Sequence, residues 1–277
     1  MRPARQLKAV DFDQNRHTLR YRISPIRTQD DLRASIKDLI GDRAFVLKPR
    51  PDRRFFTFGS CFAENVAEAL IRKGGSVYTS RVTEDINSPY NNLMLLRRVF
   101  FGTQSAAADE LQANTGVDFT ELRKELAKAT DVIFTLGNIF RLECEGVHTV
   151  ISTKYCQMVI ETFNETVECL REILKILVEH TNARIFVSVS PIPISGYFGD
   201  DFKTAVEADC ASKCQLVAAI RTLSGFTYIP TFEIFRWLPA HQDFPTFGAG
   251  RDNPRHLWGA HVGIVMEALC GKKIESA

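Results

Sequence analysis

Apolar positions along the chain fall into short blocks, and their spacing switches between a period typical of strands and one typical of helices. An aromatic run over residues 55–58 is typical of a strand, and it stops at Gly59 and Ser60. A helical spacing of apolar residues begins at once at Cys61, with charged and amide side chains between them. Ser60 is therefore expected at the junction of a strand and a helix.

The same two patterns extend over the rest of the chain. Strands are predicted at 55–58, 76–79, 131–136, 184–190 and 227–229, and helices at 28–40, 61–73, 92–100, 106–113, 119–128, 157–180, 201–223 and 258–271. Strands that alternate with helices are typical of a doubly wound, mainly parallel sheet. The sequence therefore predicts an α/β fold, in which ligands bind beyond the carboxyl ends of the strands.

Several polar residues follow predicted strand ends or lie in late loops: Ser60, Gly137, Asn138, Ser190 and His256. Serine is favoured at the position before a helix because its hydroxyl caps backbone N–H groups. The same position can also expose a nucleophilic hydroxyl to those N–H groups and to the positive end of the helix dipole. From its position alone, Ser60 is either a capping serine or a nucleophile.

The stretch from Gly59 to Ala63 reads Gly-Ser-Cys-Phe-Ala, the signature after which the GSCFA family is named. Other stretches resemble the family in the same order, over roughly residues 42–268: 135–137, 189–193, 212–213, 228–233 and 252–256. That family is similar to the SGNH (GDSL-like) hydrolases, in which a serine after the first strand is the nucleophile. The resemblance implies an SGNH-like (flavodoxin-like) three-layer sandwich over residues 51–277, preceded by a basic extension at 1–50.

A serine at its ordinary pKa is a poor nucleophile and needs a positioned base. The six histidines are at positions 17, 148, 180, 241, 256 and 261. His256 lies in a proline-containing loop just before the last predicted helix, where the resemblance implies the base of an Asp-x-x-His motif. Strict spacing places Asn253 at the acid position, and Asp252 is one residue too early. Three alternatives stay open: a Ser-His-Asn triad, a bulge that lets Asp252 reach the imidazole, or a Ser-His dyad.

An oxyanion hole needs donors aimed at the oxygen on which negative charge develops. The backbone N–H of Cys61 is the first candidate, and the resemblance adds Gly137 and Asn138 from a Gly-x-Asn motif. Here the asparagine follows the glycine directly, so Asn138 either donates from a shifted loop or only caps the turn. Asn91 is a further candidate that can equally be a turn residue. Cys61 is also an alternative nucleophile, but its side chain is expected to face the interface between sheet and helix.

Composition and charge limit the classes of partner and cofactor. The 277 residues carry 35 Lys and Arg against 33 Asp and Glu, but residues 1–54 hold 14 basic and 7 acidic side chains. This charge predicts either a solvated arm or a contact with an anionic partner such as an acidic carrier protein, a nucleic acid or an anionic glycan, of which we expect the carrier protein. The chain has no nucleic-acid motif, no membrane span, no secretory signal, no phosphate loop and no clustered metal ligands. We therefore expect a cytoplasmic protein without a cofactor, whose seven cysteines are reduced.

These observations together predict serine-dependent acyl transfer at an ester, through an acyl-enzyme on Ser60 with His256 as the base. The chain is expected to be an esterase or deacylase, or an O-acyltransferase that acts on a small-molecule or glycan ester or alcohol. The alternative is an SGNH-like binding module whose acid position has changed to asparagine. Lys213, in a predicted helix, is expected to be a solvated charge.

Overall fold

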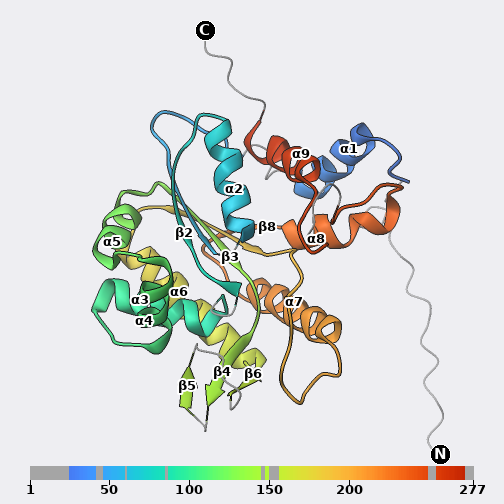
Figure 1. Cartoon of the computed structure of the whole chain (residues 1–277). Coiled ribbons are helices and arrows are strands. Elements are labelled where there is room, and N and C mark those ends of the chain that lie inside the picture. The colour runs from blue at the N-terminus through green and yellow to red at the C-terminus, as the bar shows by residue number, and fades with distance from the viewer. Residues whose placement is uncertain are drawn as a thin grey trace, which may run out of the picture.

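Five parallel strands form the central sheet, in the order β2-β1-β3-β7-β8 (Figure 1). The strands are β1 (Arg54–Gly59), β2 (Ser76–Arg81), β3 (Asp131–Leu136), β7 (Arg184–Val189) and β8 (Thr227–Ile229). Numbered along the chain, they follow the order 2-1-3-4-5 of flavodoxin-like sheets. The predicted α/β fold with a mainly parallel sheet is confirmed.

The computed structural model describes residues 25–41, 46–59, 61–84, 87–144, 147–149, 156–248 and 254–271. The helices are α1 (Gln29–Ile40), α2 (Cys61–Arg72), α3 (Pro89–Phe101), α4 (Ala106–Thr115), α5 (Phe119–Lys128), α6 (Phe163–His180), α7 (Ala205–Arg221), α8 (Thr231–Arg236) and α9 (Gly259–Cys270), with a 3₁₀ helix η3 (Leu238–His241). Helix α8 was not predicted from the sequence. It begins directly after Pro230 and contains only six residues.

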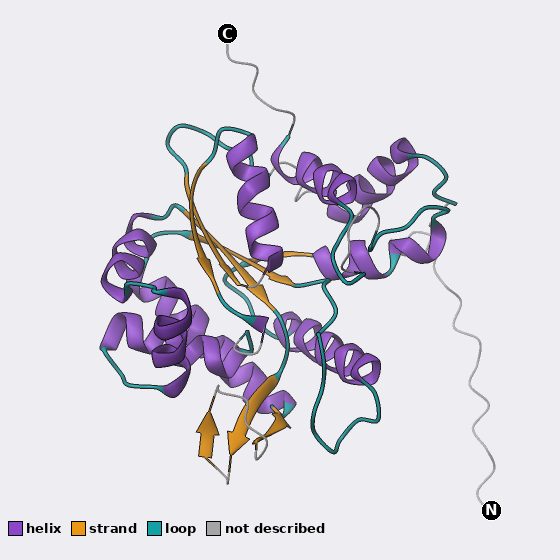
Figure 2. Cartoon of the chain, viewed as in Figure 1, coloured by secondary structure: helices purple, strands orange, loops and turns teal. Residues whose placement is uncertain are grey.

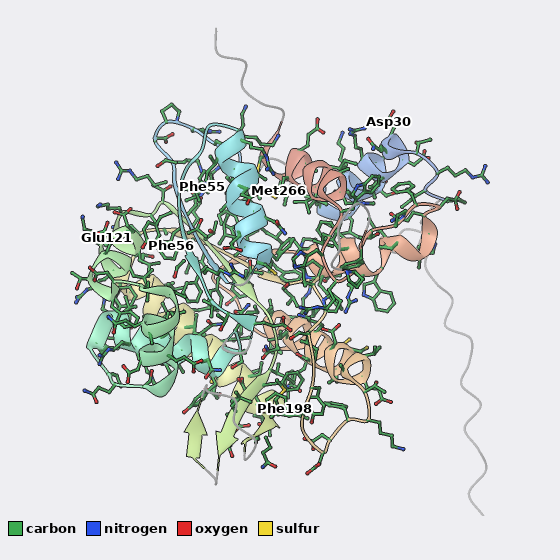
Figure 3. The ribbon with its side chains drawn as sticks, in the orientation of Figure 1. Asp30, Phe55, Phe56, Glu121, Phe198 and Met266 are labelled. Atoms are coloured by element: carbon green, nitrogen blue, oxygen red, sulfur yellow. The ribbon has the colours of Figure 1, made fainter. Side chains whose placement is uncertain are left out.

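The two faces of the sheet carry separate apolar clusters, because side chains alternate between the faces along each strand. Phe55 belongs to one cluster, together with residues of α1, α2, α8 and α9. Phe56, the next residue, belongs to the other cluster, together with residues of α3, α4, α5, α6 and α7. Phe55 and Met266 of the first cluster and Phe56 of the second are labelled in Figure 3. The result is a three-layer sandwich with β3 buried along its whole length.

A smaller antiparallel sheet lies apart from the central one (Figure 2). It consists of β4 (Phe140–Cys144), β5 (Val147–Thr149) and β6 (Cys156–Ile160). The helix predicted over 157–180 is therefore wrong at its start. The helical part begins at Phe163, because Thr162 and Glu165 form a capping box in which each side chain accepts a hydrogen bond from the other residue's backbone N–H. A second capping box, at Thr204 and Glu207, likewise starts α7 later than the predicted residue 201.

The described part of the predicted extension packs on the carboxy-terminal helix. Helix α1 buries Leu32, Ile36 and Ile40 in the cluster that contains α9, and Leu47 donates its N–H to the carbonyl oxygen of Leu269 at 2.9 Å. The division of the chain at residue 50 and the carrier contact of the arm stay predictions. No helix within the described residues is long and apolar enough to cross a membrane.

Candidate active site

The turn between β1 and α2 requires a glycine. Gly59 has φ of 144°, and a Cβ added there would lie 2.5 Å from the carbonyl oxygen of Thr135 on β3. Its own carbonyl oxygen accepts a hydrogen bond of 2.8 Å from the N–H of Val82, which follows β2. The end of β1 is therefore held tightly between its two neighbours, and helix α2 begins two residues later at Cys61. This places the amino terminus of α2 at the carboxyl edge of the sheet.

A pocket of about 400 Å³ lies at this edge. One face of α2 contributes Cys61, Glu64, Asn65 and Glu68, at the spacing of successive helical turns. The remaining lining residues come from the segment after β2, the loop after β7 and the loop before α9: Arg81, Val82, Thr83, Glu84, Ile192, Arg255 and His256. The pocket thus brings His256 and the start of α2 to the same cavity.

The loop that carries His256 is fixed by backbone pairing and by its neighbouring arginine. Leu257 forms an antiparallel bridge with Phe247, and the carbonyl oxygen of His256 accepts a hydrogen bond of 2.9 Å from Gly248. Arg255 donates from Nη1 to Glu84 Oε2 at 3.1 Å and to the carbonyl oxygen of Pro193 at 2.9 Å. Arg255 therefore ties the histidine loop to the segment after β2 and to the loop after β7.

The other histidines whose side chains are described lie elsewhere. His261 is buried in α9, stacks on Phe244 with ring centroids 5.3 Å apart, and burial lowers its pKa to about 4. His180 stacks on Phe100 at 4.6 Å at the end of α6. Of the histidine side chains described, only His256 lines the pocket beside α2. His17 lies outside the described residues.

The two candidate donors after β3 are used to hold neighbouring loops. The N–H groups of Gly137 and Asn138 both donate to the carbonyl oxygen of Asn87, at 3.0 and 3.1 Å. The side chain of Asn138 accepts from the N–H of Phe140 at 2.9 Å and donates to the carbonyl oxygen of Glu84 at 2.8 Å. For Asn138 this geometry favours the turn-capping alternative over the donor alternative.

Asn91 lies in the first turn of α3 and is 1% exposed. Its backbone N–H donates to the capping hydroxyl of Ser88 at 3.3 Å. Neither polar atom of its side chain has a hydrogen-bond partner among the described residues. An unpartnered buried amide costs free energy, so its presence is unusual in a folded protein. Among the described residues, the side-chain amides of Asn91 and Asn87 are therefore buried donors without a hydrogen-bond partner.

The family model described as "GSCFA family" matches residues 54–256, which is most of the chain. The chain belongs to the GSCFA family.

Among solved structures, the GSCFA chain is similar to a carbohydrate esterase family 2 enzyme with a carbohydrate-binding domain from Corynascus thermopiles (Myceliophthora fergusii). The two share 15% sequence identity with a TM-score of 0.41, and the match covers 80% of this chain and 65% of that chain. None of the curated proteins compared with the chain matches it.

Three of the predicted site residues, Ser60, Asn253 and Asp252, lie outside the described residues. The contact between Ser60 and His256 and the choice of partner for the imidazole therefore stay predictions. Cys61 is half-buried and both packs against the apolar cluster and lines the pocket, so its side chain is not confined to the interface between sheet and helix.

The sequence did not single out Glu84 or Arg255 as pocket residues, and the burial of Lys213 was not predicted. Glu84 belongs to none of the recognised motifs. Arg255 was considered only as part of the stretch 252–256, which ends at His256. Lys213 was expected to be solvated, but it is 1% exposed in α7 and its Nζ donates to the carbonyl oxygen of Gly137. The expectation fails because the inner face of α7 packs over the loop after β3, a contact that helical spacing alone does not reveal.

Proposed function

We propose that this GSCFA protein transfers acyl groups at an ester, through an acyl-enzyme on Ser60 with His256 as general base. The observation that supports the proposal most directly is the pocket that His256 shares with Cys61, the first residue of α2. Ser60 directly precedes Cys61 in the sequence, in the signature that names the family. A base and a nucleophile must come within hydrogen-bonding reach for proton transfer, and a shared cavity meets the first condition for this.

The reaction follows the steps of a serine hydrolase. Ser60 Oγ attacks the ester carbonyl carbon while His256 takes the hydroxyl proton, and a tetrahedral intermediate forms with negative charge on the former carbonyl oxygen. The bond between that carbon and the alcohol oxygen then breaks, and His256 returns the proton to the departing alcohol. An acceptor hydroxyl next gives its proton to His256 and attacks the acyl carbon. The bond from that carbon to Ser60 Oγ then breaks, and His256 returns the proton to Oγ, which restores the Ser60 hydroxyl.

The oxyanion is stabilised by the N–H of Cys61 and by the side-chain amide of Asn91. The N–H at the first position of a helix is one of the donors that the helix itself leaves without a partner. The Asn91 amide is buried and unpartnered among the described residues. Such fixed donors in a water-poor site contribute a large share of the rate enhancement in acyl transfer.

The lining of the pocket supports a polar alcohol rather than an apolar one. Glu64, Glu68, Arg81, Glu84 and Arg255 supply carboxylates and guanidinium groups, whereas Val82 and Ile192 are its apolar members. Carboxylates accept hydrogen bonds from hydroxyl groups, and guanidinium groups donate hydrogen bonds to them. Such a lining can therefore bind several hydroxyl groups at once. We therefore place a sugar or another polyhydroxylated alcohol on the alcohol side of the ester, with water or a second alcohol as the acceptor.

The test combines covalent labelling with steady-state kinetics. The wild-type protein is treated with a fluorophosphonate, the modified peptide is mapped, and hydrolysis of p-nitrophenyl acetate is measured in parallel. We expect the label on Ser60 and a burst of p-nitrophenol equal to the enzyme concentration. Ser60→Ala should abolish both label and turnover but keep the fold, since the loss of a capping hydroxyl costs only about 1 kcal/mol.

Two variants control for other serines and for the neighbouring thiol. Ser76→Ala alters an exposed serine at the start of β2 and should leave labelling and turnover unchanged. Cys61→Ala should keep the label on Ser60. A label that moves to residue 61 would assign the nucleophile to the thiol. Unchanged turnover in Ser60→Ala would reject serine-dependent acyl transfer.

A further inference from the structure

A lysine is buried beside the turn that follows β3 at the carboxyl edge of the sheet. Lys213 lies in the middle of α7 and is 1% exposed, and its Nζ donates to the carbonyl oxygen of Gly137. The nearest carboxylate, on Asp209, lies 4.0 Å from Nζ. That carboxylate also accepts hydrogen bonds from Arg236 and from the N–H of Ile194. The ammonium group is therefore only partly neutralised by its surroundings.

Such a burial is costly for the folded state. Removing an ammonium group from water costs several kcal/mol even after relaxation, and a distant, shared carboxylate returns only part of it. Burial accordingly lowers the pKa of Lys213 to about 8. An apolar side chain of similar length, such as methionine, would avoid this cost. Stability of the fold therefore does not explain why a lysine stands at this position.

A chain of contacts connects Lys213 to the turn that carries Asn91, the proposed side-chain donor to the oxyanion. The carbonyl oxygen of Gly137 accepts the hydrogen bond from Lys213. The N–H of Gly137 donates to the carbonyl oxygen of Asn87 at 3.0 Å. The Asn87 side chain packs so closely on Gly137 that an added Cβ would lie 2.7 Å from its Nδ2. Asn87 also accepts a hydrogen bond of 3.1 Å from the Asn92 side chain, in the first turn of α3. Lys213 is thus joined through Gly137 and Asn87 to the turn that contains Asn91.

The ammonium group also lies within electrostatic range of the pocket itself. Glu84, which lines the pocket, is among the charged groups that act on Lys213. The other charged groups that face it are Asp209 on its own helix and Arg236 on α8. The positive charge is therefore close to the place where the proposed reaction develops an oxyanion.

We propose that Lys213 is a positioning residue of the acyl-transfer site: its ammonium group fixes the Gly137 turn and, through Asn87, the first turn of α3 with the Asn91 amide. The same charge favours negative charge on the substrate oxygen. This inference rests on the proposed function. The charged form of Lys213 acts in both roles, so activity should be highest below a pH of about 8 and fall above it as the ammonium group loses its proton.

The test uses Lys213→Met with Lys203→Met as the matched control, because Lys203 is exposed just before α7. For Lys213→Met we expect kcat to fall on the order of 10²-fold, the usual effect of a misplacement of about 1 Å in an active site. KM should change less than about threefold, because the substrate contacts lie in the pocket and not on Lys213. The thermal midpoint should stay the same or rise, and the alkaline fall in activity should disappear. Lys203→Met should match the wild type in all four measurements.

The pH profile keeps the inference testable if Lys213→Met does not fold. Lys213→Arg keeps its charge at every accessible pH, so its alkaline limb should move well above 8. If the activity of Lys213→Arg still falls near pH 8, the inference is overturned. A Lys213→Met protein with the kcat and pH profile of the wild type, or one that loses stability and activity in parallel, would also overturn it. A wild-type protein that labels on Ser60 while Lys213→Met behaves normally rejects this role alone, whereas failure of Ser60 to label rejects the proposed function and the inference with it.

Discussion

Glu161 provides a quantitative test of the packing around the site. It lies between β6 and α6 and is completely buried. Its Oε1 accepts a hydrogen bond of 3.1 Å from the N–H of Tyr90 at the start of α3, and its Oε2 has no partner among the described residues. Burial raises the pKa of Glu161 from its ordinary value of 4.5 to about 7, although hydrogen bonds from Ser88 and Tyr90 act in the opposite direction.

The sign and the size of the effect follow from these values. The folded protein holds the Glu161 proton more tightly than the unfolded chain, so the stabilising contribution is fully present below about pH 4.5 and is lost as pH rises through about 7. Each pKa unit corresponds to 1.36 kcal/mol, so the free energy of unfolding should lose about 3 kcal/mol to this group at alkaline pH. Glu161→Gln resembles the protonated acid and should remove the loss.

The assay is urea unfolding of the wild type and Glu161→Gln from pH 5 to pH 9, followed by tryptophan fluorescence. The two proteins should have similar stability near pH 5, and the variant should be more stable by about 3 kcal/mol near pH 9. Glu165→Gln is the control. Glu165 is partly exposed, and hydrogen bonds from the backbone and side chain of Thr162 lower its pKa, so its contribution is lost as pH falls instead. Glutamine also keeps the capping box.

Two results would refute this reasoning. If the difference in stability between Glu161→Gln and the wild type does not change with pH, the carboxyl group does not titrate between the folded and unfolded values. If the variant becomes less stable at high pH, Glu161 is ionised in the folded protein and is stabilised by a partner that the geometry does not show.

The remaining predictions concern the proposed site. If Asn253 orients His256, Asn253→Asp should raise the rate of p-nitrophenyl acetate hydrolysis, because a carboxylate stabilises imidazolium and an amide does not. If Asp252 is the partner, Asp252→Ala should instead lower kcat by about 10⁴-fold, and indifference to both changes would indicate a dyad. Asn91→Ala should lower kcat by about 10²- to 10³-fold, as the loss of one oxyanion donor does, without lowering the urea midpoint, and unchanged kcat would exclude Asn91 as a donor.

The sequence predicted the central sheet well because its strands are continuous apolar or aromatic runs. The predicted strands at 131–136 and 227–229 match β3 and β8 residue for residue. For β3, which is buried at every position in the middle of the sheet with helices on both sides, the apolar run and the topology agree. The turn at Gly59 was equally visible, since the period changes from strand to helix within two residues.

The small sheet could not be predicted in the same way. Strand β6 was taken as the first turns of a helix, because a short apolar run fits either period. Its strand conformation depends on pairing with β4, from Phe140 opposite Ile160 to Cys144 opposite Cys156. Such a pairing is a tertiary contact that no local pattern contains.

The site shows a similar division between residues that act and residues that hold them. Motif and position make Ser60 and His256 the proposed nucleophile and base, because nucleophiles and bases are restricted to a few residue types. Residues 212–213 resemble the family, but no local pattern in the sequence shows that Lys213 is buried rather than solvated. Its burial depends on the Gly137 carbonyl and the inner face of α7 meeting in space. Supporting residues of this kind are found only from coordinates.

Glu84 shows how such support is organised. Its carbonyl oxygen accepts from Asn138 after β3 at 2.8 Å, and its carboxylate accepts from the N–H of Ser195 after β7 and from Arg255 beside His256. One residue therefore joins three loops that reach the carboxyl edge of the sheet from different strands. Residues of these loops, Val82, Ile192 and Leu257, also pack in the apolar clusters. The directed hydrogen bonds of Glu84 add to this packing, so we expect the position of His256, the proposed base, to depend in part on a glutamate that has no chemical step of its own.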